Sequence, residues 1–252
     1  VDGNAGLGTS DFCVMKYEAK NDGSGNAVSQ PASTPWGNIT AVDAFNKCLA
    51  ITEGGFPGTF ALISNPEWMT LSRDIEGNTA NWSGGVVGSG HIPRGHTDDL
   101  PSTRLAVTDT NKPYDSVQNG FSDAVGSGWE QKRTQVLSNG SQIWDLSGNV
   151  WEWVDWDSSG DGVFTTGPID ETSVWKEFSD ASVGSLLTDD YMPLGPYTSA
   201  NSFGAWFGGS NGAALRGGDY DRGNYAGVYT LILNYTDNST NPSQGFRCVY
   251  RP

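Results

Sequence analysis

Side chains suited to contacting another molecule are concentrated near the C-terminus, in residues 216–247. Five of the nine tyrosines lie between residue 216 and the C-terminus. Tyr provides a large, rigid contact area, Asn and Ser provide adaptable hydrogen bonds, and Tyr and Arg often dominate binding energies. The stretch therefore predicts binding without chemistry, although ordinary tyrosines of a half-buried sheet would give the same composition. The expected ligand contacts are Asp219, Tyr220, Asp221, Arg222, Asn224, Tyr225, Tyr229, Ile232, Asn234 and Tyr235.

Other residues of this stretch are expected to hold its backbone. Arg216 and Arg247 should bind loop carbonyls, and Val228 and Phe246 should lie in the core. Glycine tolerates backbone conformations that other residues avoid. A role in backbone geometry is therefore expected for Gly217, Gly218, Gly223, Gly227 and Gly245.

No catalytic residue is predicted. The sequence has neither a G-x-S-x-G motif nor a phosphate-binding loop. An enzyme working in residues 216–247 would have to use Asp219 or Asp221 as its titratable acid.

Two groups of residues have ligand types that metals prefer. The first is a segment that resembles the first half of a calcium loop, in which side-chain oxygens stand at alternate positions and a glycine stands sixth. Its oxygen-bearing residues are Asp155, Asp157, Ser159 and Asp161, and its glycine is Gly160. Thr166 stands where such a loop has a glutamate, so a solvated acidic turn is the competing interpretation. The second group is His91 and His96, which could hold zinc together with Asp98 and Asp99. The two histidines are five residues apart, a spacing that does not place them on one face of a helix. No cofactor is expected, with Ca²⁺ as the alternative.

The charge of the chain excludes some partners. The net charge is −15, with 14 Lys and Arg among 252 residues, and binding to nucleic acid or to an anionic membrane requires clustered basic residues. No run of 18 apolar residues is present, so membrane insertion is not expected.

The elements that must position these residues are short. A helix is expected from Thr40, with Ala44, Phe45, Cys48 and Leu49 on one face. A second is expected from Asn65 as N-cap, followed by Pro66; its apolar stripe is Trp68, Leu71 and Ile75.

Strands are predicted over residues 11–20, within 141–156 and over 245–250. In the second of these, Trp151 and Trp153 should share one face, opposite Val150, Glu152 and Val154. Residues 77–140 and 162–210 are predicted to be mostly long loops with short strands.

The chain has three cysteines, Cys13, Cys48 and Cys248. One disulfide with one free thiol and three free thiols are both compatible with this count.

Several motifs follow one another in a familiar order. They are KYEAK, DAFNKC, NPEWMTLSRD, DLSGNVWEW, ALRGGDY and GFRCVYR, and the most specific parts are GNVWEW (148–153), RGG (216–218) and GFR (245–247). Over nearly its whole length the chain resembles the formylglycine-generating-enzyme family, also called sulfatase-modifying factors. The resemblance implies an α+β, C-type lectin-like fold of the formylglycine-generating-enzyme subtype, with two helices, small antiparallel sheets and long ordered loops.

The resemblance also bears on activity. The oxidase members have a pair of copper-binding cysteines between RGG and GFR, whereas no cysteine lies between Arg216 and Arg247 here, so oxidase activity is not expected. A second branch with this fold resembles the chain better: the variable proteins of diversity-generating retroelements, particularly the archaeal ones, whose C-terminal segment is rewritten at adenines.

The composition of the C-terminus agrees with that branch. When the adenines of an Asn codon are replaced, the resulting codons never encode Lys, Glu, Met or Trp. These four types supply 27 of the 252 residues, so a proportionate share of the last 37 would be about four, but none is present.

We therefore expect residues 1–252 to form a single domain with 216–247 as its variable ligand-binding segment. The expected partner is an external protein or glycan, and the expected location is surface-displayed, secreted or virion-associated. The alternatives are a divergent enzyme related to the sulfatase-modifying factors and a structural or assembly protein.

Overall fold

The computed structural model describes residues 1–52, 55, 57–107, 128–156, 161–162, 164, 172–180, 190–209 and 212–252. In these ranges the α-helices are α1 (Ala41–Leu49) and α2 (Asn65–Gly77). The strands are β1 (Cys13–Val14), β2 (Lys20–Asn21), β3 (Ala27–Val28), β4 (Thr59–Leu62), β5 (Thr134–Val136), β6 (Gln142–Trp144), β7 (Trp151–Trp153), β8 (Trp175–Lys176), β9 (Trp206–Phe207), β10 (Ala213–Arg216), β11 (Leu231–Tyr235), β12 (Gln244–Phe246) and β13 (Cys248–Arg251).

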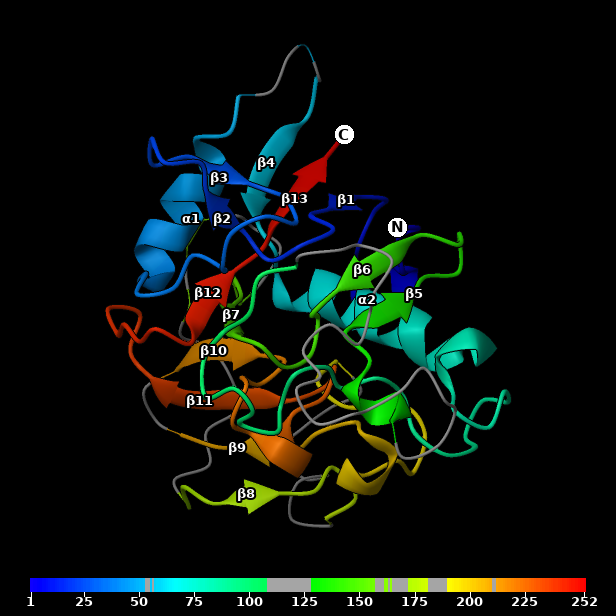
Figure 1. The fold of residues 1–252 in the computed structure, drawn as a ribbon. Coiled ribbons are helices and arrows are strands. Elements are labelled where there is room, and N and C mark those ends of the chain that lie inside the picture. The colour runs from blue at the N-terminus through cyan, green and yellow to red at the C-terminus, as the bar shows by residue number, and fades with distance from the viewer. Residues whose placement is uncertain are drawn as a thin grey trace.

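The largest sheet has the strand order β12-β7-β10-β11-β9-β8, and a smaller one has the order β1-β13-β4. Figure 1 shows β12, β7, β10 and β11 side by side, although they come from distant parts of the chain. The smaller sheets are antiparallel as expected, but the large sheet contains two parallel pairs, β12 with β7 and β11 with β9. Strand β7 pairs in parallel with β12 and antiparallel with β10, so its own residue pattern identifies neither pairing.

Helix α1 begins where predicted, because the Thr40 hydroxyl accepts a hydrogen bond from the backbone N–H of Asp43. Ala44 and Cys48 are buried, whereas Leu49 is 48% exposed. The expected four-residue face is therefore wrong at Leu49. In this helix the narrow buried stripe is formed by Ala41, Ala44 and Cys48.

Helix α2 is capped by Ser64 rather than by Asn65 as predicted. Ser64 and Glu67 form a capping box, in which the Ser64 N–H donates to the Glu67 carboxylate at 2.8 Å. The Asn65 side chain instead accepts a hydrogen bond from Arg216. The predicted stripe of Trp68, Leu71 and Ile75 is confirmed, since all three are fully buried.

Each of the three predicted strands is interrupted. Residues 11–20 contain only β1 and the start of β2, and β6 and β7 are separated by a turn in which Asp145 and Asn149 have positive φ. The C-terminal strand divides at Arg247, because β12 belongs to the large sheet and β13 to the smaller one. Pattern alone does not reveal where a chain passes between sheets.

The core consists of two main clusters of buried residues. Trp151 and Trp153 belong to one and Val154 to the other, which confirms their predicted opposite faces on β7. A disulfide between Cys48 and Cys248 connects α1 to β13, while Cys13 is free and exposed. Of the two cysteine arrangements, one bridge with one thiol is therefore correct. No helix in the described ranges is long and apolar enough to cross a membrane.

Candidate ligand surface

The predicted ligand-contacting residues lie on β11 and on the loop between β10 and β11. The loop leaves β10 after Arg216, passes through a short 3-10 turn at Gly223–Tyr225, and enters β11 at Leu231. It lies next to the centre of the large sheet, where β10 pairs with both β7 and β11 (Figure 1). A central position in a sheet gives such a loop a rigid base.

The loop backbone is fixed by a second loop, residues 94–99. The N–H of Gly223 donates to the carbonyl of Thr97 at 2.8 Å, and the N–H of Asp99 donates to the carbonyl of Tyr220 at 2.7 Å. Arg94, which is buried, donates to the side-chain oxygen of Asn224 at 2.8 Å. The two contacts between backbone atoms hold the loop in place independently of its outward side chains.

Side chains of this loop reach the surface together. Asp221, Asn224 and Tyr225 are exposed, and Tyr220 and Arg222 are half-buried. Tyr225 has 44% of its surface exposed. Five of the ten predicted contacts thus lie within six consecutive residues and are accessible to a partner.

A row of aromatic rings supports Tyr225. Its ring stacks on Trp175 with centroids 4.8 Å apart and planes inclined by 8°, and Trp175 stacks on Trp151 at 6.3 Å and 14°. The guanidinium of Arg222 lies 5.9 Å from the Trp151 ring centroid, within range of a cation–π interaction. Trp175 is a functional candidate that the sequence analysis missed, because its two-residue strand lies in a stretch predicted to be mostly loop.

The charged residues of the loop form one network. The Arg222 Nε donates to the Asp219 carboxylate at 2.8 Å, and its Nη2 lies 2.7 Å from Asp221. Burial raises the pKa of Asp219 to about 6, against the lowering effect of Arg222 and of a hydrogen bond from Ser243. Asp219 therefore titrates closer to neutral pH than an ordinary aspartate does.

Two further predicted contacts lie at the end of β11. Asn234 and Tyr235 are both half-buried. Tyr235 is among the groups near enough to Arg222 to raise its pKa, after Asp219 and Asp221, so it lies close to the loop. We use "ligand surface" below for Tyr220, Asp221, Arg222, Asn224, Tyr225 and Tyr235.

Three predicted contacts have little or no accessible surface. Tyr229 is fully buried; its hydroxyl donates to Glu76, and its ring stacks on Phe203 at 5.4 Å. The prediction for Tyr229 is wrong, because the ring is part of the core. Ile232 and Asp219 are 5% and 3% exposed, and they lie beneath the surface instead of on it.

The residues predicted to hold the backbone do so. Arg247 donates to the carbonyls of Met15 and Trp144 at 2.8 and 2.9 Å, and Arg216 donates to the carbonyl of Tyr229 at 2.8 Å. Val228 and Phe246 are fully buried, as expected. Gly218 has a φ of +88°, and a Cβ there would lie 2.7 Å from the Cβ of Ala226, so the loop needs glycine at this position.

The predicted calcium loop is only partly described. Asp155 is fully buried and Asp161 is exposed, while Asp157 and Ser159 lie outside the described residues. In the described ranges no group of three or more His, Cys, Asp and Glu residues could hold a metal ion. Calcium binding by this loop stays a prediction.

The two histidines have separate partners. The Nδ1 of His91 lies 3.6 Å from Glu130, and the Nδ1 of His96 lies 3.3 Å from Asp98. The ring of His96 also stacks on Tyr220. His96 therefore contributes to the support of the ligand surface.

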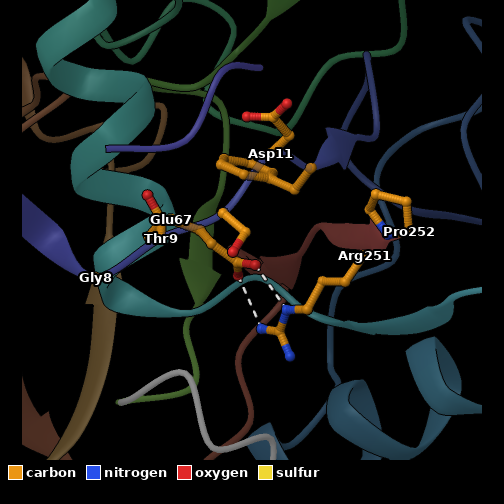
Figure 2. Close-up of a pocket in the computed structure, with 8 residues that line it drawn as sticks. Gly8, Thr9, Asp11, Glu67, Arg251 and Pro252 are labelled. Atoms are coloured by element: carbon orange, nitrogen blue, oxygen red, sulfur yellow. Dashed lines mark hydrogen bonds and ion pairs between the residues drawn. The ribbon is translucent and has the colours of Figure 1, made fainter. Parts of the chain in front are cut away.

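A cavity of roughly 680 Å³ lies away from the ligand surface, between the N-terminal segment and β13 (Figure 2). Its charged residues include Glu67 and Arg251, which form an ion pair at 2.7 Å. Asp11, also on its wall, accepts a hydrogen bond from the N–H of Gly3. Because these groups already have partners within the chain, we do not take this cavity as the ligand site.

Residues 9–252 match the family described as Sulfatase-modifying factor enzyme 1-like domain. The chain belongs to this family. Its two helices and small sheets form the C-type lectin-like fold of the sulfatase-modifying factor family, as the motifs at 148–153, 216–218 and 245–247 predicted.

No curated protein matches this member of the sulfatase-modifying factor family by sequence. Among solved structures, the chain is similar to Treponema denticola variable protein 1, with 13% identity and a TM-score of 0.44, covering 96% of this chain and 85% of that one. It is also similar to the Major Tropism Determinant I1 variant, with 14% identity and a TM-score of 0.35, covering 99% of this chain and 48% of that one. It thus spans about half the length of the latter protein.

Proposed function

We propose that this chain is a binding protein and that its ligand surface contacts an external protein or glycan. The observation that carries the proposal is that the backbone and the side chains have different roles in the loop of residues 217–230. Its backbone is hydrogen-bonded to residues 94–99, whereas the side chains of Tyr220, Asp221, Arg222, Asn224 and Tyr225 reach solvent. Side chains presented on a rigid backbone lose little conformational freedom on binding.

The chemistry of the ligand surface suits recognition. Tyr225 is both exposed and supported from below by Trp175, so its ring is already oriented for a partner. Arg222 is held by Asp219 and Asp221 in the same way. Pre-oriented Tyr and Arg side chains are the kind that dominate binding energies.

The proposal includes diversification of this surface. The absence of Lys, Glu, Met and Trp from the last 37 residues supports a variable protein of a diversity-generating retroelement. The archaeal type is proposed from the resemblance of the sequence alone. Such a protein would be displayed on a surface, secreted or carried on a virion. The coding DNA should then be accompanied by an imperfect copy of this segment that differs at adenines.

The proposal also holds that the chain is not an enzyme. An enzymatic alternative would need Asp219 as its acid, but this carboxylate is 3% exposed and bonded to Arg222. Copper oxidase chemistry would need thiolates between Arg216 and Arg247, and the sequence has none there.

A binding screen tests the proposal. The wild-type chain and a variant with Tyr220→Ala, Tyr225→Ala and Tyr235→Ala are compared against arrays of cell-surface proteins and glycans. Tyr250→Ala is the control, because this half-buried tyrosine lies on β13 outside the ligand surface. We expect the triple variant to fold and to lose the wild-type partner, and the control to keep it. A triple variant that binds as tightly as the wild type contradicts the proposal.

A further inference from the structure

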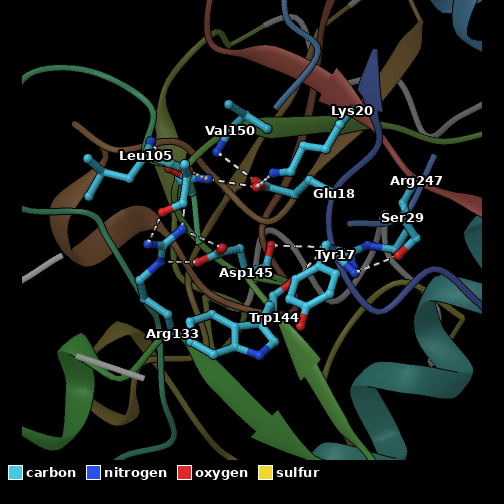
Figure 3. Close-up of polar contacts among 12 residues, drawn as sticks. Tyr17, Glu18, Lys20, Ser29, Leu105, Arg133, Trp144, Asp145, Val150 and Arg247 are labelled. Atoms are coloured by element: carbon cyan, nitrogen blue, oxygen red, sulfur yellow. Dashed lines mark hydrogen bonds and ion pairs between the residues drawn. The ribbon is translucent and has the colours of Figure 1, made fainter. Parts of the chain in front are cut away.

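A lysine, a glutamate and an asparagine meet in the core, away from the ligand surface. Lys20 and Glu18 are two residues apart in an extended segment, and Figure 3 shows their side chains next to each other. Asn149 belongs to the turn before β7. All three residues are at most 1% exposed.

One oxygen atom contacts both nitrogen-bearing side chains. The Oε2 of Glu18 accepts a hydrogen bond from the Asn149 Nδ2 at 2.6 Å, and it lies 3.9 Å from the Lys20 Nζ. The Lys20 Nζ has no hydrogen-bond partner in the described part of the chain. A buried amine that makes no hydrogen bond is costly and calls for an explanation.

The amide of Asn149 is held in a fixed orientation. Its Oδ1 accepts a hydrogen bond from the N–H of Leu105 at 2.6 Å, and its Nδ2 also donates to the carbonyl of Leu105 at 3.1 Å. An N–H group aimed at a carbonyl oxygen stabilises the negative charge that develops there when a nucleophile attacks the carbon.

Burial favours the uncharged forms of the other two groups. It raises the pKa of Glu18 well above its ordinary value, and the neighbouring Asp145 raises it further, against the lowering effect of Lys20. Burial lowers the pKa of Lys20, against the raising effect of Glu18. A neutral amine is a nucleophile, and a protonated carboxyl group is a proton donor.

We propose that Lys20 and Asn149 join in an intramolecular amide bond, with Glu18 as the proton-transfer group. In this step the Lys20 side chain swings toward Asn149, its Nζ attacks the Cγ, and the Cγ–Nδ2 bond breaks. Glu18 gives a proton to the departing Nδ2 and takes one from Nζ, so its own protonation is unchanged. The products are the new amide and one molecule of ammonia, and no oxidant or other reactant is needed.

The bond would consume the amine that makes no hydrogen bond, and it would connect β2 covalently to the turn that precedes β7. A covalent link between distant residues stabilises a fold mainly by restricting its unfolded state. This inference concerns the core and does not depend on what the ligand surface binds.

Mass spectrometry of the refolded full chain, with its disulfide reduced, tests the inference. We expect the wild type to be lighter than its sequence mass by one ammonia, with the peptides containing Lys20 and Asn149 recovered as one branched species. Lys20→Arg and Glu18→Gln should have their full sequence masses. Lys47→Arg is the matched control and should keep the deficit, because this lysine already donates to the carbonyl of Gly25.

The wild-type spectrum is decisive even if a variant fails to fold. A wild-type chain of full sequence mass after prolonged incubation, with Lys20 and Asn149 in separate peptides, overturns the inference. The three residues would then be a buried polar cluster without covalent chemistry.

Discussion

The ring of Tyr220 stacks on the imidazole of His96, with centroids 6.1 Å apart and planes inclined by 22°. Tyr220 belongs to the ligand surface, whereas His96 lies more than a hundred residues earlier in the chain. The His96 ring is fully buried, and its Nε2 is 3.0 Å from the carbonyl of Thr103. A residue outside the proposed variable segment therefore determines how a residue inside it is presented.

Replacing His96 should destabilise the protein. His96→Ala leaves a cavity under Tyr220 and removes the contact with Thr103, so we expect a loss of about 2–3 kcal/mol in the free energy of unfolding. Urea denaturation measures this loss. His91→Ala is the matched control, because that side chain is 37% exposed, and it should change stability by less than about 0.5 kcal/mol. Equal effects of the two variants would contradict the buried role of His96.

Replacing Trp175 should weaken binding without changing the ligand surface itself. Trp175→Ala removes the ring on which Tyr225 stacks, so Tyr225 becomes free to adopt other rotamers. Once a partner is known, we expect its Kd to rise by roughly tenfold, corresponding to about 1.4 kcal/mol. Trp175→Phe keeps a ring beneath Tyr225 and should recover part of the affinity. Unchanged affinity in Trp175→Ala would show that the aromatic row does not support binding.

Asp219 should make stability depend on pH in a defined direction. Its pKa of about 6 in the folded protein is above the value of about 3.9 expected in the unfolded chain. A raised pKa contributes stability that is fully present below the unfolded value and is lost as pH rises through the folded one. As pH rises from 4 to 7, the wild type should therefore lose about 2–3 kcal/mol of its free energy of unfolding relative to Asp219→Asn, which cannot ionise at this position.

Urea denaturation of both proteins across that pH range measures the difference. A constant difference between Asp219→Asn and the wild type would contradict the raised pKa.

Reduction of the disulfide should destabilise the chain. Cys48 and Cys248 are 200 residues apart, and removing a bridge that closes such a long loop typically costs about 2–5 kcal/mol. Thermal unfolding with and without reductant measures the change. Cys13→Ser should leave both Tm values as they are, because Cys13 is free and exposed. A wild-type Tm insensitive to reductant would contradict a stabilising role of the bridge.

The sequence predicted best the features that depend on local pattern. The apolar stripe of α2 was predictable because Trp68, Leu71 and Ile75 recur at helical spacing. The opposite faces of β7 followed from simple alternation. The family motifs implied the C-type lectin-like fold, and they marked the ends of residues 216–247, which contain the loop between β10 and β11.

The features that sequence did not reveal depend on tertiary contacts. Tyr229 belongs to the same tyrosine-rich segment as Tyr225 and Tyr235. Its ring is nevertheless part of the core, where it stacks on Phe203 and its hydroxyl donates to Glu76. The two-residue strand of Trp175 is too short to show a period. The N-cap of α2 is Ser64 and not the predicted Asn65, because Glu67 completes a capping box with Ser64. The Asn65 side chain instead binds the guanidinium of Arg216, from a distant part of the chain.

Strands β10 and β12 lie on either side of β7, so residues 217–243 begin after one strand that pairs with β7 and end before the other. The outward side chains between them can be exchanged without disturbing the strand pairing that defines the sheet. A lineage carrying this protein could therefore replace its recognition residues repeatedly and still inherit the same architecture.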